Sequence, residues 1–154
     1  MGGVRRGAAA IYKVLIALFA VAVIVQIFLA GLGIFSALPE EGESVTSDSF
    51  DDKFEPHSAL GFFLLLGSLL LLILILIAWT GPRSIGATFG LFVLVVVQMV
   101  LAWTGEDAPG VAALHPVNAL IILALSGFLA RRAWRGNLLI PPSQLGAPAP
   151  PPAP

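Results

Sequence analysis

The sequence contains no cysteine and very little charge. The absence of cysteine excludes disulfides, thiolate catalysis, iron–sulfur clusters and thiolate metal sites, and it leaves the redox compartment undecided. Only 11% of the 154 residues are charged, whereas 58% are hydrophobic, and the mean hydropathy is +0.97. Soluble domains are about 25% charged and about 45–50% apolar. This composition predicts an integral membrane protein with one domain.

The run 57–79 is free of charge and contains no strongly polar residue except His57. A transmembrane helix needs about 20 apolar residues, and three other runs approach this length. The first run is too long for the core of a signal peptide, which has about 7–15 residues, so we expect it to be retained. The predicted helices cover about 14–35, 57–79, 85–104 and 111–130. We therefore predict an all-α fold, a transmembrane four-helix bundle with up-down-up-down topology, over residues 14–132.

The segments outside these helices differ in charge. Residues 1–13 are basic, and the loop 38–56 is acidic. Residues 133–154 form a Pro- and Ala-rich tail that we expect to be disordered. In a four-pass chain every basic residue except Lys53 falls on one side, and all nine acidic residues fall on the other. Because Lys and Arg mark the cytoplasmic side, we predict a multi-pass protein of the cell membrane with both termini in the cytoplasm.

Aromatic residues fit the same frame. Tyr12, Trp79 and Trp134 fall at the predicted inner boundary, and Trp103 falls at the outer one. Such residues form belts at membrane–water interfaces. We therefore expect all four to lie at the membrane surface.

The two halves of the sequence look like copies of one helical hairpin. Gln26 and Gln98 are each followed by Ala four residues later and by Gly seven residues later. His57 and His115 are each followed by a small residue, an apolar residue and a serine at offsets of four, seven and eleven. These offsets lie on one helix face. Coincidence in an apolar sequence is the alternative, but the matched Gln and His residues favour a duplication.

The paired histidines are the main candidates for a functional site. They lie at the same end of the second and fourth predicted helices, which are diagonal in such a bundle. A diagonal gap of roughly 12–14 Å is too wide for a small ion unless the helices lean together, but it suits a flat macrocycle ligated from both sides. Gly61 and Ala119, one turn below, would leave room for the ring. We therefore predict one heme b near the extracytoplasmic face, with His57 and His115 as iron ligands.

Other polar residues within the predicted helices have several interpretations. Gln26 and Gln98 are expected to face the bundle interior, where they could orient the histidines, contact a ligand or hydrogen-bond between helices, which is the favoured interpretation. The same alternatives apply to Asn118. Ser68 and Ser126 are expected to meet a ring edge or helix carbonyls. They lack an acid–base partner, so we do not expect nucleophilic catalysis and favour a protein that is not an enzyme.

The histidines also have an interpretation without function. A histidine is tolerated at a membrane interface because its ring is amphipathic, and Pro56 and Pro116 place both rings near helix starts. The acidic loop is expected to be a solvated surface. Its alternative role is capture of a metal ion by carboxylates.

The chain resembles a family of small four-helix bacterial membrane proteins of unassigned function, over about residues 14–132. The motifs that carry the resemblance are Gln26…Gly33, His57-x-x-x-Gly61, Gln98…Gly105 and His115-Pro116-Val117-Asn118-Ala119. The resemblance implies the fold and the topology but no activity.

A looser resemblance is to one half of heme A synthase, and further to cytochrome b561-type bundles. It implies heme ligation by histidines on alternate helices, here His57 and His115. The chain departs from heme A synthase because it has one such half, because Glu55 lies two rather than three residues before His57, and because Ser58 replaces an arginine. Synthase activity is therefore not expected, whereas simple heme binding is compatible with these departures.

Three hypotheses follow. The leading one is a heme b protein for electron transfer or heme handling, with a redox partner in the membrane. The first alternative is a non-catalytic scaffold or accessory protein. The second is a metal or small-solute site at the outer mouth, built from His57, His115 and the acidic loop. Each requires a lipid bilayer, and none involves nucleic acid.

Overall fold

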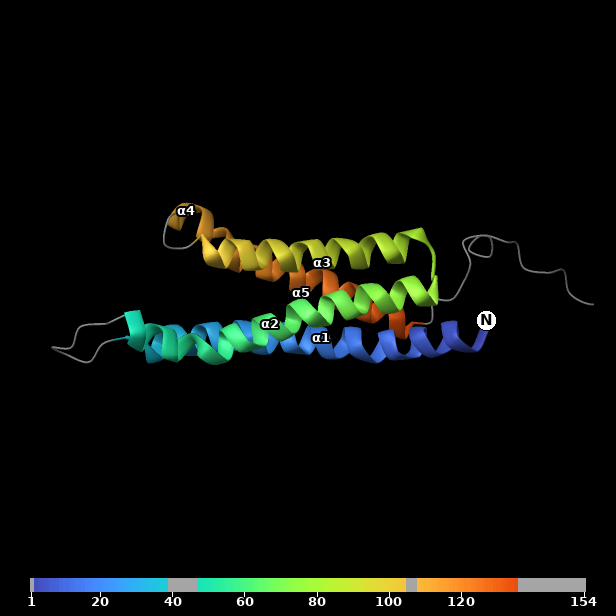
Figure 1. Ribbon diagram of the computed structural model, residues 1–154, viewed down its shortest axis with the longest axis horizontal. Helices are drawn as coiled ribbons and strands as arrows, with labels where there is room; N and C mark the ends of the chain where they lie inside the picture. Colours follow the sequence, from blue (N-terminus) through green and yellow to red (C-terminus); the bar gives the residue numbers. More distant parts are fainter. Residues whose placement is uncertain (1, 39–46, 105–107, 136–154) are drawn as a thin grey trace, which may run out of the picture.

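The computed structural model describes residues 2–38, 47–104 and 108–135, with only the backbone for residues 47–50. The helices are α1 (Gly2–Ser36), α2 (Ser47–Ala78), α3 (Pro82–Trp103), α4 (Pro109–Ala112) and α5 (Leu114–Trp134). Both α1 and α3 pack against α2 and α5 (Figure 1). Among these helices the diagonal pairs, α1 with α3 and α2 with α5, make no backbone contact. The predicted all-α, up-down-up-down bundle is confirmed.

Two helices begin earlier than the predicted spans. α1 begins at Gly2, within the basic segment, and α2 begins at Ser47 and continues through Pro56. The added turns of α2 are held against α1 by Phe54, because a Cβ placed on Gly33 would lie 3.0 Å from the Phe54 ring. Part of the segment predicted as an acidic loop is therefore helical. Its remainder at 39–46, the acidic segment 105–107 and the predicted tail from 136 lie outside the described residues.

A short turn joins α2 to α3, as the Gly and Pro of the sequence predict. Gly81 has a φ of 105°, a conformation that glycine adopts without steric cost. Pro82 is the first residue of α3, where its missing N–H has no intrahelical partner in any case. The two hairpins, α1–α2 and α3–α5, are therefore consecutive along the chain.

The buried core repeats from one hairpin to the other. Several buried residues of α1 have buried counterparts 72 positions later in α3, and several of α2 have counterparts 58 positions later in α5. The matched pairs are Phe19 and Leu91, Val23 and Val95, Leu64 and Ile122, Ser68 and Ser126, and Leu71 and Leu129. The interior thus has the duplicated arrangement that the sequence predicts.

The outer surface of the bundle is apolar. Phe28, Phe63, Phe89 and Phe128 are all more than half exposed, although soluble proteins rarely expose apolar patches above a few hundred Å². Four helical segments are long and apolar enough to span a bilayer. The chain is a multi-pass membrane protein, and its exposed apolar side chains suit a lipid bilayer.

The two ends of the bundle differ in charge. At the basic end, α1 and α3 begin and α2 and α5 finish, with Arg5, Arg83 and Arg131. At the acidic end, α2 begins near Asp51 and Asp52, and the short helix α4 lies just before the start of α5 (Figure 1). The predicted placement of the basic end in the cytoplasm stays a prediction.

The three tryptophans lie at the ends of the helices and are exposed by 57–76%, as belt residues are. The prediction for Tyr12 is wrong, because its side chain is fully buried. Tyr12 lies seven residues before Phe19 on the core face of α1, and its hydroxyl lies 2.8 Å from Thr88 Oγ1 of the diagonal helix α3. It links helices inside the bundle instead of anchoring the chain in the interface.

Candidate cofactor-binding cavity

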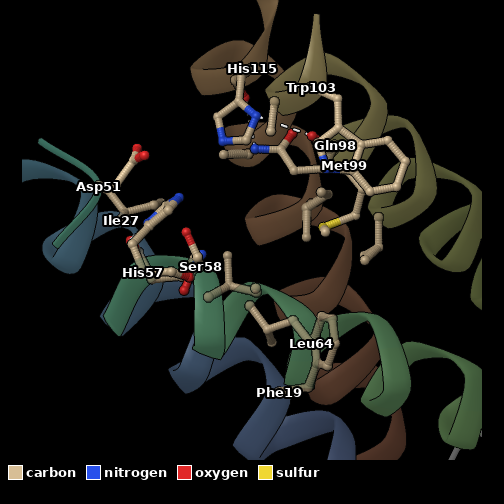
Figure 2. A pocket seen from close by; sticks show the side chains of 17 residues that line it. Phe19, Ile27, Asp51, His57, Ser58, Leu64, Gln98, Met99, Trp103 and His115 are labelled. Carbon is tan, nitrogen blue, oxygen red and sulfur yellow. Dashed lines mark hydrogen bonds between the residues drawn. The ribbon is translucent and has the colours of Figure 1, made fainter. Parts of the chain in front are cut away.

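A cavity of about 400 Å³ lies between the two hairpins at the acidic end (Figure 2). Its floor is apolar and includes Phe19, Leu64 and Ile122. Phe19 is seven residues from Gln26 on α1, so the cavity reaches about 10 Å below the glutamine. The polar residues that line it are Gln26, Asp51, His57, Ser58, Gln98 and His115. Gly61 and Ala119 also line the cavity, so all six residues predicted for the site lie around it.

In the first hairpin, Gln26 and His57 bind each other reciprocally. The Gln26 Nε2 amide donates to the carbonyl oxygen of His57 at 2.7 Å. The His57 ring returns a bond from Nδ1 to the carbonyl oxygen of Gln26 at 3.1 Å. Each residue thus hydrogen-bonds through both its side chain and its backbone carbonyl. The two bonds connect α1 to α2 at the level of the cavity.

The second hairpin contains the same pair. Gln98 Nε2 donates to the carbonyl oxygen of His115 at 3.0 Å, and His115 Nδ1 donates to that of Gln98 at 3.1 Å (Figure 2). The duplication therefore extends to individual hydrogen bonds. The favoured prediction for the glutamines, bonding between helices, is confirmed.

The two rings meet across the cavity although their helices are diagonal. The ring centroids of His57 and His115 are 6.2 Å apart, and the ring planes are inclined by 54°. Both side chains are half-buried. Figure 2 shows His115 with Trp103 and Met99 on one side of the cavity, and His57 with Asp51 on the other. The depths of the two rings therefore differ by no more than this separation, in keeping with the duplicated hairpin.

The hydrogen bonds also fix the chemical form of both rings. A backbone carbonyl only accepts hydrogen bonds, so the neutral imidazoles of His57 and His115 carry their hydrogen on Nδ1. Each Nε2 then holds an unshared electron pair. In Figure 2 the nitrogen of His115 that is not bonded to Gln98 faces the side on which His57 lies. Ligating histidines in metalloproteins commonly have this support, an Nδ1–H bonded to a backbone carbonyl.

The small and hydroxyl residues below the histidines have defined partners. A Cβ on Gly61 would lie 3.1 Å from Gln26 Nε2, so the glycine makes room for the glutamine amide. Ser68 donates to the Leu65 carbonyl at 2.7 Å, and Ser126 donates to that of Leu123 at 3.0 Å. Of the two expectations for the serines, bonding to helix carbonyls is confirmed.

The hairpins differ at one polar position. Asn118 Nδ2 donates to Gln98 Oε1 at 2.7 Å and lies 2.9 Å from the carbonyl oxygen of Leu94. The residue 58 positions earlier is Leu60, which has no donor. The buried Oε1 of Gln26 consequently has no hydrogen-bond partner among the described residues.

The described part of the chain contains no group of three or more His, Cys, Asp or Glu residues that could hold a metal ion. The alternative site that adds the acidic loop falls partly outside it. Sequence reasoning considered Asp51 only as one carboxylate of the acidic loop, and it did not identify Met99 and Trp103 as lining residues. Their signal was positional, because Met99 and Trp103 are one and five residues after Gln98 on α3.

Comparison with known proteins gives one match. A family described as being of unknown function, DUF6220, matches residues 26–105, a region that contains Gln26, His57 and Gln98 but ends before His115. No curated protein and no solved structure matches the chain. The looser resemblance to heme A synthase therefore finds no support here. The match covers more than half of the sequence, and the chain belongs to DUF6220, a family of unknown function.

Proposed function

We propose that this membrane protein binds one heme b between His57 and His115, near the acidic end, for electron transfer or heme handling. The observation that carries the proposal is the pair of imidazoles across one cavity, 6.2 Å apart between centroids. Bound heme would supply a one-electron couple between ferrous and ferric iron. The residues of the chain would hold and orient it and exclude water from its apolar part.

The separation of the rings suits ligation of one central metal from opposite sides. An imidazole nitrogen lies about 2 Å from a metal ion it binds, and the ring centre lies about 1 Å further, so two opposed rings have centres about 6 Å apart. The observed 6.2 Å agrees with this value. Little movement of α2 or α5 is then needed for binding, which lowers the cost of assembling the site.

The hydrogen-bonding groups of the cavity also favour an electron-pair acceptor. His57 Nε2, His115 Nε2, Gln26 Oε1 and the Asp51 carboxylate all accept, whereas the ring N–H groups are already used. Heme iron is such an acceptor and needs only two protein ligands, because the macrocycle supplies the other four. A bare zinc ion needs three or four protein ligands, and no such cluster occurs among the described residues. These points support a ring cofactor over a simple ion.

An absorption spectrum of the full chain in detergent, purified with added heme, tests the proposal. We expect a Soret band and, after reduction, the sharp visible bands of six-coordinate heme. His57→Ala and His115→Ala should each give a five-coordinate spectrum, and the double variant should bind no heme. Ser58→Ala is the matched control, because Ser58 lines the cavity without being a proposed ligand. No Soret band, or a double variant that binds as the native chain does, would overturn the proposal.

A second candidate is a scaffold or accessory protein. It is favoured by the two reciprocal Gln–His pairs, which are complete without any ligand. In that case the double histidine variant would lower the thermal stability of the bundle and change no spectrum. The same set of variants therefore separates the two functions.

A further inference from the structure

Two features of the first hairpin bear on ligand binding. Its glutamine, Gln26, has a buried Oε1 without a partner, whereas the Gln98 Oε1 is satisfied by Asn118. In addition, an apolar groove of about 200 Å³ runs between α1 and α2. Leaving a buried carbonyl oxygen unpaired costs about 1–3 kcal/mol. A ligand that donates a hydrogen bond would remove this cost.

The groove adjoins the cavity. Phe19 and Leu64 line both, so these two side chains form the wall between them. Leu60, which replaces the asparagine of the second hairpin, also lines the groove. Gly67 leaves the flank of Phe19 uncovered, because a Cβ there would be 3.5 Å from Phe19 Cδ2. When the Phe19 side chain turns aside, a molecule from the lipid phase could keep an apolar tail in the groove while its head reaches Gln26.

The chemistry of the lining limits the head group. Gln26 Oε1 requires an O–H or N–H donor. Among the described residues that line the cavity, Asp51 is the only charged one, so an anionic head would be repelled. The groove itself is lined by apolar side chains and Gly67. A neutral head with a hydroxyl and an apolar tail therefore suits this lining.

We infer that the first hairpin binds a membrane quinol, with one hydroxyl donating to Gln26 Oε1 and the alkyl or isoprenoid tail in the groove between α1 and α2. This deepens the proposed function, on which its redox step depends, by naming the electron donor. A quinol that is fully oxidised gives up two electrons and two hydroxyl protons and becomes a quinone. One electron would reduce the ferric heme, and the second would follow after the ferrous heme had passed the first to a one-electron acceptor in the membrane; the two protons would pass to water at the mouth beside Asp51.

Binding is measured first on the heme-free full chain in detergent. The probe is a decyl-substituted hydroquinone kept anaerobic, the readout is the fluorescence of Trp103, which lines the cavity, and Trp103→Phe identifies that signal. We expect the hydroquinone to bind about tenfold more tightly than its dimethyl ether, because the ether cannot donate. Equal affinities for the two probes would overturn the inference.

Two pairs of variants locate the head and the tail. Leu60→Asn places in the first hairpin the donor that the second already has, and should abolish the preference for the hydroquinone; Leu60→Met, which adds no donor, should preserve it. Gly67→Leu fills the groove and should weaken the decyl probe about tenfold while sparing a hydroquinone without a tail. Gly127→Leu is its control, since Gly127 has nothing within 4 Å of an added Cβ. Unchanged binding in Leu60→Asn and Gly67→Leu contradicts the inference.

Two further measurements distinguish the quinol from other lipids and from failure of the heme proposal. A monoacylglycerol with the same tail has hydroxyl donors but no redox chemistry, and competition as strong as that of the quinol would overturn the assignment. If heme binds, decyl-hydroquinone should reduce it about tenfold more slowly in Leu60→Asn than in Leu60→Met, with equal rates for dithionite. If heme does not bind, the fluorescence experiment still decides on the quinol site.

Discussion

The rings of His57 and His115 stand 6.2 Å apart across the cavity because each is turned by the carbonyl of a glutamine in its own hairpin. The glutamine amides return the bond to the histidine carbonyls. The orientation of the two histidines, which are the candidate iron ligands, thus depends on contacts within each hairpin. The first prediction concerns these contacts.

Replacing Gln98 should destabilise the bundle more than replacing Gln26. The Gln98 side chain takes part in two hydrogen bonds, with His115 and Asn118, whereas that of Gln26 makes one, with His57. We expect Gln98→Leu to lower the free energy of unfolding by about 1 kcal/mol more than Gln26→Leu. Unfolding in detergent, followed by circular dichroism, measures the difference. A larger loss for Gln26→Leu would contradict it.

The hydrogen bond between Tyr12 of α1 and Thr88 of α3 should have a different effect on stability depending on which partner is removed. Thr88 lies 2.8 Å from the Tyr12 hydroxyl and also donates to the Ser84 carbonyl at 3.0 Å. Tyr12→Phe leaves Thr88 its second partner and should cost about 0.5–1.5 kcal/mol, whereas Thr88→Val strands a buried tyrosine hydroxyl and should cost about 1–3 kcal/mol. Thermal unfolding of both variants in the same detergent gives the order. Equal costs would show that the tyrosine finds another partner.

Gly33 should be sensitive to substitution, unlike its neighbour Gly31. A Cβ at Gly33 would lie 3.0 Å from the Phe54 ring, whereas Gly31 has nothing within 4 Å. Gly31→Ala should be neutral or stabilising by up to about 1 kcal/mol, since alanine favours the helix. Gly33→Ala should be less stable than Gly31→Ala by about 1–2 kcal/mol, because Phe54 must shift. Phe54 also packs edge-on to His57, 6.0 Å between centroids, so a bound heme should show an altered spectrum in this variant only.

The orientation of the chain can be tested because no native cysteine interferes. Single substitutions at exposed residues of the two ends, Arg5→Cys and Asp52→Cys, provide labels. In intact cells a membrane-impermeant thiol reagent should modify Asp52→Cys and spare Arg5→Cys, as the distribution of basic residues predicts. Labelling of both after cell lysis is the control. The reverse pattern would place the cavity on the cytoplasmic side.

The sequence predicts most of the fold, because length, hydropathy and charge determine which segments span a bilayer. It also predicts the partners in the cavity, since Gln26 and His57 recur as Gln98 and His115 at matched spacing. It could not predict the start of α2 at Ser47, because the helix there depends on Phe54 packing over Gly33. Local polarity and Pro56 argue against a helix when that tertiary contact is not known.

Two other features depend on packing across the bundle. Tyr12 has the position of an interface residue in the sequence, yet its face of α1 points to the core and meets Thr88. The difference between Asn118 and Leu60 is visible in the sequence, but its meaning is not. Its consequence for hydrogen bonding appears only in the structure, where Asn118 satisfies the Gln98 Oε1 and the Gln26 Oε1 has no partner among the described residues.

Each glutamine–histidine pair lies within one hairpin, and the chain passes between the hairpins at Gly81. Among the described residues, two side-chain hydrogen bonds join the two hairpins, one between Tyr12 and Thr88 and one from the Trp134 indole to the carbonyl oxygen of Lys13. A break in the backbone at Gly81 would therefore leave two fragments, each with its own correctly turned imidazole. Synthesised separately in one membrane, such fragments should recombine through their matching apolar faces into the complete four-helix assembly.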